Sequence, residues 1–115
     1  MLLACALPSA ALAQTVRLLV QSSPLAGFRY HEAPAAFPAM RAGDELTLTR
    51  EPDNPHDPSA VRVEWQGRLL GYVPRARNDA IAWAMDRGEA LTARVSRLQP
   101  HRNPRLRIEF EIYVQ

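Results

Sequence analysis

Hydrophobic and polar residues alternate with a period of two along most of the chain. Such alternation is typical of strands that bury one face against a core and expose the other to solvent. We therefore predict five half-buried strands, with core-facing residues Val16, Leu18 and Val20; Leu46 and Leu48; Val61, Val63 and Trp65; Leu91, Ala93 and Val95; and Ile108, Phe110, Ile112 and Val114.

Turn-forming residues join further strands to these five. Gln66 and Gly67 separate residues 61–65 from an apolar stretch at 68–73, so the pair predicts a hairpin turn. Residues 27–31 predict one more short strand, with Gly27 easing a bend. Five to seven short strands with one inserted helix are typical of a small SH3-like or OB-like β-barrel, so the predicted fold class is all-β with one helix.

The inserted helix is expected between the strands at 68–73 and 91–95. Asn78 or Asp79 can cap its first turn, and Gly88 suits the position after its last turn. Ile81, Ala84 and Met85 form an apolar stripe with helical spacing. Trp83 falls off this stripe, so we expect an exposed indole there, whereas Trp65 is in phase with the core.

Two proline-containing segments are predicted to be irregular. Residues 33–42 show no clear period and are expected to form a loop that includes at most a short helical turn. Pro52, Pro55 and Pro58 remove three backbone donors from residues 51–58, which excludes regular structure there and predicts a rigid loop.

The first thirteen residues differ from the rest of the chain. They are apolar and uncharged, and they end in Ala11-Leu12-Ala13, a small-x-small pattern. The segment lacks a basic start, yet it predicts a signal peptide at residues 1–13 and one domain at residues 14–115. Export to the periplasm or beyond follows if the signal is real, and a cytoplasmic protein follows otherwise. Cys5 lies within this segment, so the mature chain would contain no cysteine.

The composition is that of one folded domain. With 115 residues, 47% hydrophobic and 23% charged, the chain is neither disordered nor long enough for two typical domains. It contains no apolar run of 18 residues, so no membrane span is expected. All 14 basic residues are arginine, whose planar and permanently charged side chain suits phosphate groups.

Positive charge is concentrated in the second half of the chain. Residues 14–64 carry a net charge of −2, whereas residues 65–107 carry +6. A basic edge of this kind permits an anionic partner. Five arginines fall in one window without an acid, namely Arg94, Arg97, Arg102, Arg105 and Arg107.

Catalytic and cofactor signatures are absent from the sequence. It contains no G-x-S-x-G, no H-E-x-x-H and no glycine-rich phosphate loop, so we expect no enzyme and no cofactor. The three histidines and Asp57 match no zinc-ligand spacing, so no metal site is expected.

Three motifs together carry a family resemblance. They are G-F-R-Y-H at residues 27–31, E-P-D-N-P-H-D-P-S-A-V at residues 51–61 and L-G-Y-V-P-R at residues 70–75. In this order and spacing they resemble the HIRAN domain, over roughly residues 18–114. This module occurs at the N-terminus of helicase-like chromatin remodellers and as a free-standing bacterial protein. The resemblance implies a modified OB-like barrel that binds single-stranded DNA at its 3′ end.

The resemblance also implies roles for individual residues. Arg29 and Tyr30 match an Arg-aromatic pair that contacts the terminal nucleotide. Asp57 matches the aspartate that accepts a hydrogen bond from the 3′-hydroxyl, and His56 stands before it where an aromatic residue is usual.

The later motifs imply contacts along the strand. Tyr72 and Arg75 match residues that approach the phosphates. The late loop at residues 99–104 has no Phe, Tyr or Trp where family members stack an aromatic ring on a base. His101 or Arg102 can substitute, because imidazole and guanidinium planes also stack.

Local structural roles compete with these assignments. Asn54 and Asp57 can hydrogen-bond within their own loop as Asx-turns. Tyr30 can cover the barrel mouth, and Arg29 can pair with Glu32 or Asp44. We therefore predict a non-catalytic module whose partner is single-stranded DNA or another nucleic acid, with an exported structural or protein-interaction module as the alternative.

Overall fold

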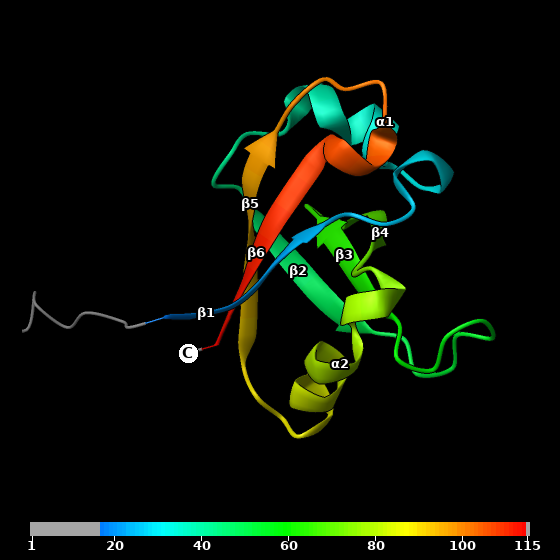
Figure 1. The fold of residues 1–115 in the computed structure, drawn as a ribbon, viewed down its shortest axis with the longest axis vertical. Helices are drawn as coiled ribbons and strands as arrows, with labels where there is room; N and C mark the ends of the chain where they lie inside the picture. The colour runs from blue at the N-terminus through cyan, green and yellow to red at the C-terminus, as the bar shows by residue number, and fades with distance from the viewer. Residues whose placement is uncertain (1–16, 115) are drawn as a thin grey trace, which may run out of the picture.

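The structure is a computed structural model that describes residues 17–114, so the predicted signal peptide lies outside the described residues. Its six strands form one antiparallel sheet (Figure 1). No helix among the described residues is long and apolar enough to cross a membrane. The strands are β1 (Leu18–Pro24), β2 (Glu45–Arg50), β3 (Val61–Trp65), β4 (Arg68–Tyr72), β5 (Leu91–Leu98) and β6 (Ile108–Val114).

The sheet curls until its two edges meet. Its strand order is β1-β6-β5-β2-β3-β4, so β1 and β4 are the edges. Ala26, just after β1, and Tyr72, at the end of β4, exchange two backbone hydrogen bonds of 2.9 Å each. This bridge closes the sheet into a small barrel, which confirms the predicted fold class.

Gly71 permits this closure. A Cβ atom added at Gly71 would lie against the carbonyl oxygen of Ala26, far inside van der Waals contact, and 3.1 Å from the Leu25 side chain. Any larger residue would therefore push the two edges apart.

The predicted alternation is confirmed in the strands that line the core. In β3 every second side chain is buried. In β6 the same holds for Ile108, Phe110 and Ile112, whereas Val114 at its end is only half-buried, and Phe110 is completely inaccessible. Trp65 is buried as expected, with its indole Nε1 donating to Asp44 at 3.0 Å. The hairpin at Gln66 and Gly67 is also confirmed, since both residues have the positive φ that a tight two-residue turn requires (49° and 78°).

The predicted pattern is wrong at the start of the first strand. Leu18 and Val20 are 64% and 48% exposed instead of core-facing. The register of β1 against β6 shifts between Leu19 and Gln21, and burial begins only at Ser23. The first half of β1 extends along the edge of the barrel rather than over its core (Figure 1).

The strand predicted at residues 27–31 is also wrong. Gly27 adopts a left-handed conformation with φ 80°, and residues Phe28–Tyr30 form a 3-10 turn. The isolated bridge at Ala26 comes just before this segment, and the chain turns away from the sheet directly after it. Phe28 points inward and is 3% exposed.

Two short helical segments cover the ends of the barrel. The segment predicted as a loop at residues 33–42 contains α1 (Ala33–Ala36) and the 3-10 turn Phe37–Ala39. The predicted inserted helix is α2 (Asp79–Asp86), with its apolar residues Ile81 and Ala84 buried. Trp83 is 72% exposed, as predicted.

Candidate nucleic-acid interface

The proline-containing loop between β2 and β3 is built from successive turns. Backbone amides of Asn54, Asp57 and Ala60 each donate to the carbonyl oxygen three residues earlier. The Asn54 side-chain oxygen also accepts from the amides of His56 and Asp57, at 2.8 and 3.2 Å. The Asx-turn expected at Asn54 is thus confirmed, and it fixes the backbone on which Asp57 stands.

Both carboxylate oxygens of Asp57 have a partner. Oδ1 accepts from the Ser59 amide at 3.0 Å, and Oδ2 accepts from the Asn78 side-chain nitrogen at 2.6 Å. Asn78 stands at the N-cap position of α2, but its side chain makes no capping bond. The expected capping role is therefore wrong for the side chain, which is buried and holds Asp57 instead.

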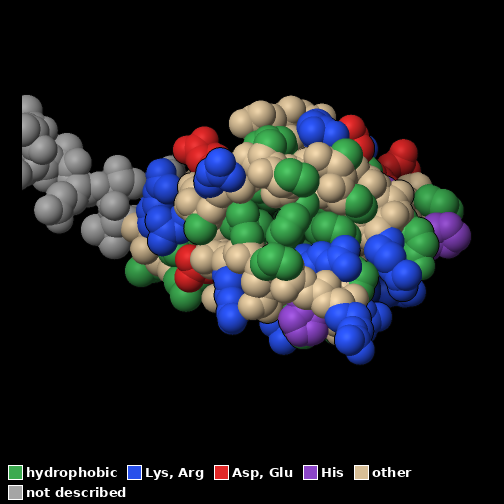
Figure 2. All heavy atoms as spheres, turned by 90° about the horizontal axis from the view of Figure 1, so that it is seen from above, with side chains coloured by type: hydrophobic (Ala, Val, Ile, Leu, Met, Phe, Trp, Pro, Cys, Tyr) green, Lys and Arg blue, Asp and Glu red, His purple; other side chains and the backbone are tan. Residues whose placement is uncertain are grey.

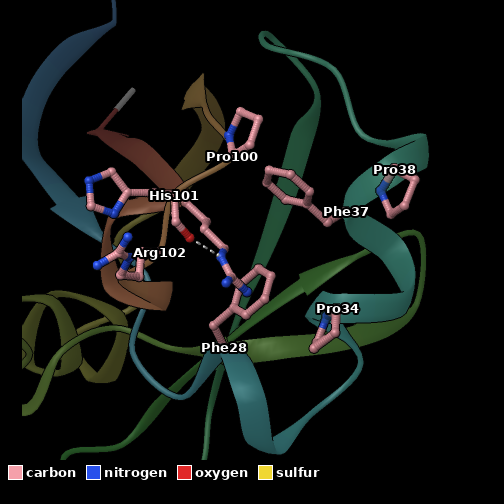
Figure 3. A pocket seen from close by; sticks show the side chains of 8 residues that line it. Phe28, Pro34, Phe37, Pro38, Pro100, His101 and Arg102 are labelled. Atoms are coloured by element: carbon pink, nitrogen blue, oxygen red, sulfur yellow. Dashed lines mark hydrogen bonds between the residues drawn. The ribbon is translucent and has the colours of Figure 1, made fainter.

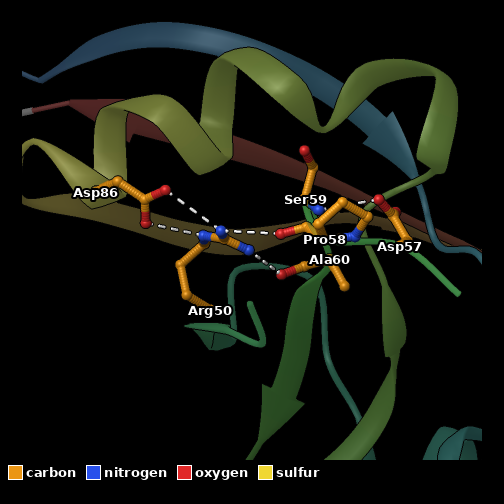
Figure 4. A network of polar contacts seen from close by, with 6 residues as sticks. All are labelled: Arg50, Asp57, Pro58, Ser59, Ala60 and Asp86. Atoms are coloured by element: carbon orange, nitrogen blue, oxygen red, sulfur yellow. Dashed lines mark hydrogen bonds and ion pairs between the residues drawn. The ribbon is translucent and has the colours of Figure 1, made fainter. Parts of the chain in front are cut away.

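Arg50 ties the same loop to the other end of α2 (Figure 4). Its guanidinium donates to the carbonyl oxygens of Ala60 and Pro58, at 2.8 and 3.0 Å. It also makes a bidentate ion pair with the Asp86 carboxylate, at 3.0 and 3.2 Å. The hydrogen bonds from Arg50 lower the pKa of the Asp86 carboxyl. The helix therefore holds the Asp57 loop at two points.

Four of the predicted site residues line one hollow, which we call the end hollow: His56, Asp57, Tyr72 and Arg75. The Tyr72 ring packs edge-on against His31, with centroids 5.4 Å apart. Its hydroxyl donates to Glu51 at 3.1 Å, and burial, together with this carboxylate, raises the Tyr72 pKa. Arg75, which also lines this hollow, is exposed.

Arg29 and Tyr30 lie in a second hollow, the middle hollow, together with Arg105. Tyr30 is 80% exposed, so it does not cover the barrel mouth. The carboxylates that could have neutralised Arg29 have other partners. Glu32 pairs with Arg68, and Asp44 accepts from the Trp65 indole and the Arg41 amide.

His101 and Arg102 lie in a third hollow, the late-loop hollow, between the β5–β6 loop and the α1 segment (Figure 3). His101 Nδ1 accepts from the Asn103 amide at 2.8 Å, so this ring nitrogen is occupied within the loop. Phe28 and Phe37 supply aromatic walls to the hollow.

The segment 25–28 joins the three hollows. Ala26 lines the end hollow, Leu25 and Gly27 line the middle hollow, and Phe28 is shared by the middle and late-loop hollows. The predicted site residues are therefore brought to one continuous face. Figure 2 views the molecule from above, onto the end that carries the β5–β6 loop, where arginine side chains surround a depression lined by hydrophobic ones.

Ion pairing divides the arginines of residues 17–114 into two groups. Five pair with carboxylates, namely Arg50, Arg62, Arg68, Arg87 and Arg94. Arg94 belongs to the arginine window that contains no acid in the sequence. In the structure, however, Glu111 of the neighbouring strand pairs with it at 3.7 Å.

Nine arginines of the described chain have no carboxylate partner, and seven of these line four adjoining hollows. The fourth hollow, which we call the flank hollow, shares Arg105 with the middle hollow and also contains Glu109. The available positive charge is thus gathered along one path. The seven are Arg29, Arg75, Arg77, Arg97, Arg102, Arg105 and Arg107.

Several residues that shape the candidate interface were not predicted from the sequence. Asn78 donates a hydrogen bond to Asp57 from 21 residues away in the sequence. Arg50 donates to carbonyl oxygens of the same loop from at least eight residues away. No local motif signals such contacts. Phe37 was in a segment without periodicity, and Arg77 lay outside the basic window. Within residues 17–114, no three His, Cys, Asp or Glu side chains are grouped closely enough to hold a metal ion.

Comparisons with known proteins agree with this architecture. The chain is 33% identical over 73 residues to a rice (Oryza sativa subsp. japonica) Fanconi-associated nuclease 1 homolog, a match covering 60% of this chain but only 7% of that protein. A crystal structure of a Lactobacillus plantarum protein superposes with a TM-score of 0.74 at 27% identity, covering 86% of this chain and 95% of that one.

A second solved structure shares the fold. The HIRAN domain of human HLTF superposes with a TM-score of 0.65 at 19% identity, covering 85% of this chain and 78% of that one. The family model for the HIRAN domain matches residues 18–115, nearly the whole described chain. The family match supports a DNA-binding module. This chain belongs to the HIRAN domain family.

Proposed function

We propose that this HIRAN domain binds single-stranded DNA and recognises a free 3′-hydroxyl end without catalysing a reaction. The observation that carries the proposal is the gathering of seven carboxylate-free arginines along four adjoining hollows. Proteins that bind single strands combine a cationic groove with flat stacking surfaces. The exposed ring of Tyr30 beside Arg29 supplies such a surface.

Asp57 is the group proposed to recognise the strand end. A carboxylate has about four lone-pair positions, so the two bonds to Ser59 and Asn78 leave acceptor capacity on Asp57, which lines the end hollow. A 3′-hydroxyl is a donor, and its hydrogen bond to an ionised carboxylate is charge-assisted. A 3′-phosphate would instead place negative charge against Asp57.

The proposal of a non-catalytic role rests on the residue types and motifs of the chain. The sequence lacks the nucleophile and metal motifs of hydrolases. The rice relative is named a nuclease, but this chain spans only 7% of its length. We therefore assign binding, and no cleavage, to the domain.

Fluorescence anisotropy with short labelled oligonucleotides tests the proposal. We expect the protein to bind a single strand with a free 3′-hydroxyl more tightly than the same strand with a 3′-phosphate. A duplex with blunt blocked ends serves as the control. Equal affinity for both single strands would refute end recognition, and absence of binding would favour the protein-interaction alternative, for which the exposed Trp83 is a candidate contact.

A further inference from the structure

We infer that the first half of β1 is an interface through which two copies of this chain pair edge to edge. β1 is an edge of the sheet, with β6 on one side of it. Within residues 17–114, its other side is bridged only at Ala26, beyond the end of the strand. Residues 18–21 therefore present backbone donors and acceptors that another strand can satisfy. These residues line none of the four hollows, so the inference goes beyond the proposed function and does not rest on it.

The two halves of this edge differ in their protection against pairing. Proline and charged side chains commonly keep a sheet edge from pairing with another chain. In the second half, Arg77 donates to the Ser22 carbonyl oxygen at 3.1 Å, and Pro24 has no backbone donor. Residues 18–20 carry neither feature. The part of the edge that is open to another strand is therefore its first half.

The same half exposes apolar side chains on both faces of the sheet. Leu18, Leu19 and Val20 are 64%, 54% and 48% exposed, because the first half of β1 extends beyond the core (Figure 1). Successive residues of a strand point to opposite faces, so a partner lying on one face would leave part of this surface in water. A strand lying alongside covers both faces and also satisfies the backbone.

The sequence of this edge is complementary to itself. In an antiparallel pairing centred on Leu19, this residue faces its own copy, and Leu18 faces Val20 of the second copy. Arg17 faces Gln21, which is uncharged, so the Cα atoms of the two Arg17 residues are about 13 Å apart along the strands. The register places apolar residues opposite one another and separates the like charges. A second copy of the chain therefore fits this edge, through an interface with two-fold symmetry.

The neighbouring strand supports the centre of the pairing. Leu19 lies opposite Tyr113 of β6, so the two side chains share one face of the sheet. The Tyr113 hydroxyl donates to Glu111 at 2.8 Å, and the guanidinium of Arg94 lies 4.9 Å from the ring centroid. Each Leu19 would have a fixed aromatic ring on one side and the second Leu19 on the other. Such cross-strand apolar pairs stabilise antiparallel sheets.

Sedimentation velocity of the full chain, without nucleic acid, tests the pairing. The interface is small, so we expect a reversible dimer whose sedimentation coefficient rises with protein concentration. Leu19→Lys places two positive charges opposite one another and should abolish this rise. Trp83→Lys introduces the same charge at another exposed apolar residue and should leave the rise unchanged. Both residues are exposed, so thermal melts should show that both variants are folded.

Disulfide crosslinking tests the register and captures a weak dimer. Leu19→Cys and Trp83→Cys are compared in a Cys5→Ser background, because Cys5 is the one cysteine of the chain. Facing residues of an antiparallel pair have Cβ atoms about 4.5–5.5 Å apart, near the distance that a disulfide spans. Pairing also raises the local thiol concentration, so oxidation should yield a covalent dimer about tenfold faster for Leu19→Cys than for Trp83→Cys.

The inference is overturned by any of three results. They are a wild-type chain that stays monomeric at every concentration, an association that Leu19→Lys leaves unchanged, and equal crosslinking rates for the two cysteine variants. Loss of association in Trp83→Lys would place the interface on α2 and would also overturn it. No nucleic acid is present in these experiments, so a failed pairing leaves the proposed function standing.

Discussion

The side-chain nitrogen of Asn78 donates to the carboxylate of Asp57 at 2.6 Å, across 21 residues of sequence. Asn78 is 1% exposed at the start of α2, and Asp57 stands at the rim of the end hollow. The buried Asn78 amide fixes one carboxylate oxygen of Asp57, a residue that lines the end hollow. The bond therefore couples the position of the helix to the geometry of the proposed end site.

Removing Asn78 should destabilise the fold and weaken end recognition together. Asn78→Ala takes away the buried donor and leaves the Asp57 carboxylate with one fewer partner, which we expect to cost about 1–3 kcal/mol in the free energy of unfolding. Urea denaturation measures this cost. Asn103→Ala removes an exposed side chain that accepts from the Arg105 amide, and it should cost about 0.5 kcal/mol. Equal costs for the two variants would contradict a special role for Asn78.

Asp57→Ala should abolish the preference for a free 3′-hydroxyl. The charge-assisted bond is worth about 1.5–3 kcal/mol, so affinity for the hydroxyl end should fall about ten- to a hundredfold. Affinity for the 3′-phosphate end should not fall, because the carboxylate makes no favourable contact with that end and repels its charge. Anisotropy titrations with both ends measure the difference.

A thermal melt must accompany the Asp57 titrations. Asp57 also accepts from Ser59 and Asn78, so its loss alters the loop as well as the ligand site. Asp57→Asn keeps the side-chain volume and removes the charge, and it should also lower the hydroxyl preference. A folded Asp57→Ala protein that distinguishes the two ends as wild type does would rule out the assigned role.

Salt dependence should identify the arginines that meet phosphates. On single strands, log K falls with log[salt] by about 0.7 for each phosphate neutralised. We therefore expect a double variant, Arg102→Gln and Arg105→Gln, to have a shallower slope of log K against log[salt]. The slope should change by about 0.7 for each phosphate that the two arginines neutralise in the wild type. Titrations at several salt concentrations give the slopes.

A charge-matched double variant controls for net charge. Arg87 and Arg94 pair with Glu89 and Glu111 and lie outside the four hollows, although Arg94 lines a separate groove on the sheet. Arg87→Gln with Arg94→Gln therefore removes the same charge and should leave the slope near the wild-type value. If both double variants flatten the slope equally, the effect is one of total charge and the phosphate path is not the one proposed.

The Arg50–Asp86 pair should make stability depend on pH in the acidic range. The pKa of Asp86 is lowered in the folded protein, so the pair stabilises the fold fully above the unfolded pKa of about 3.9. This stabilisation is lost as pH falls from there through the folded pKa. We expect Asp86→Asn to be less stable than wild type at neutral pH, with the difference disappearing in acid. Urea denaturation at a series of pH values measures it, and a difference that is constant with pH would contradict the linkage.

Gly71→Ala should be strongly destabilising. The added methyl group would collide with the Ala26 carbonyl oxygen, which cannot move without breaking the bridge that closes the barrel. We expect a loss of at least about 3 kcal/mol, at the upper end for overpacking. Ala80→Ser, on the exposed face of α2, should change the free energy of unfolding by less than about 0.5 kcal/mol. Similar stabilities for the two variants would show that the edges can separate without cost.

Elements whose signal is local could be predicted from the sequence. Alternation defined β3 and β6, because a strand with one buried face must repeat every two residues. Gln66 and Gly67 defined the hairpin, and the stripe around Ile81 defined α2, for equally local reasons. The three motifs also indicated the family correctly, since their residues and spacing can be read without a structure.

Which side chains are available to a ligand depends on the tertiary structure. Leu18 and Val20 alternate like core residues, but the register shift in β1 leaves them exposed, and alternation cannot report a register. Arg94 appeared free until Glu111 was placed beside it on the neighbouring strand.

Some features of the candidate site could likewise be predicted from the sequence, whereas others arise only in the folded structure. Motif residues such as Asp57 were readable from the chain, whereas the Asn78 bond that positions Asp57 and the placing of Phe37 opposite the late loop were not. These contacts join segments far apart in sequence, and the curling of the sheet brings them together. Their physical cause is closure of the barrel, which no local pattern of residues encodes.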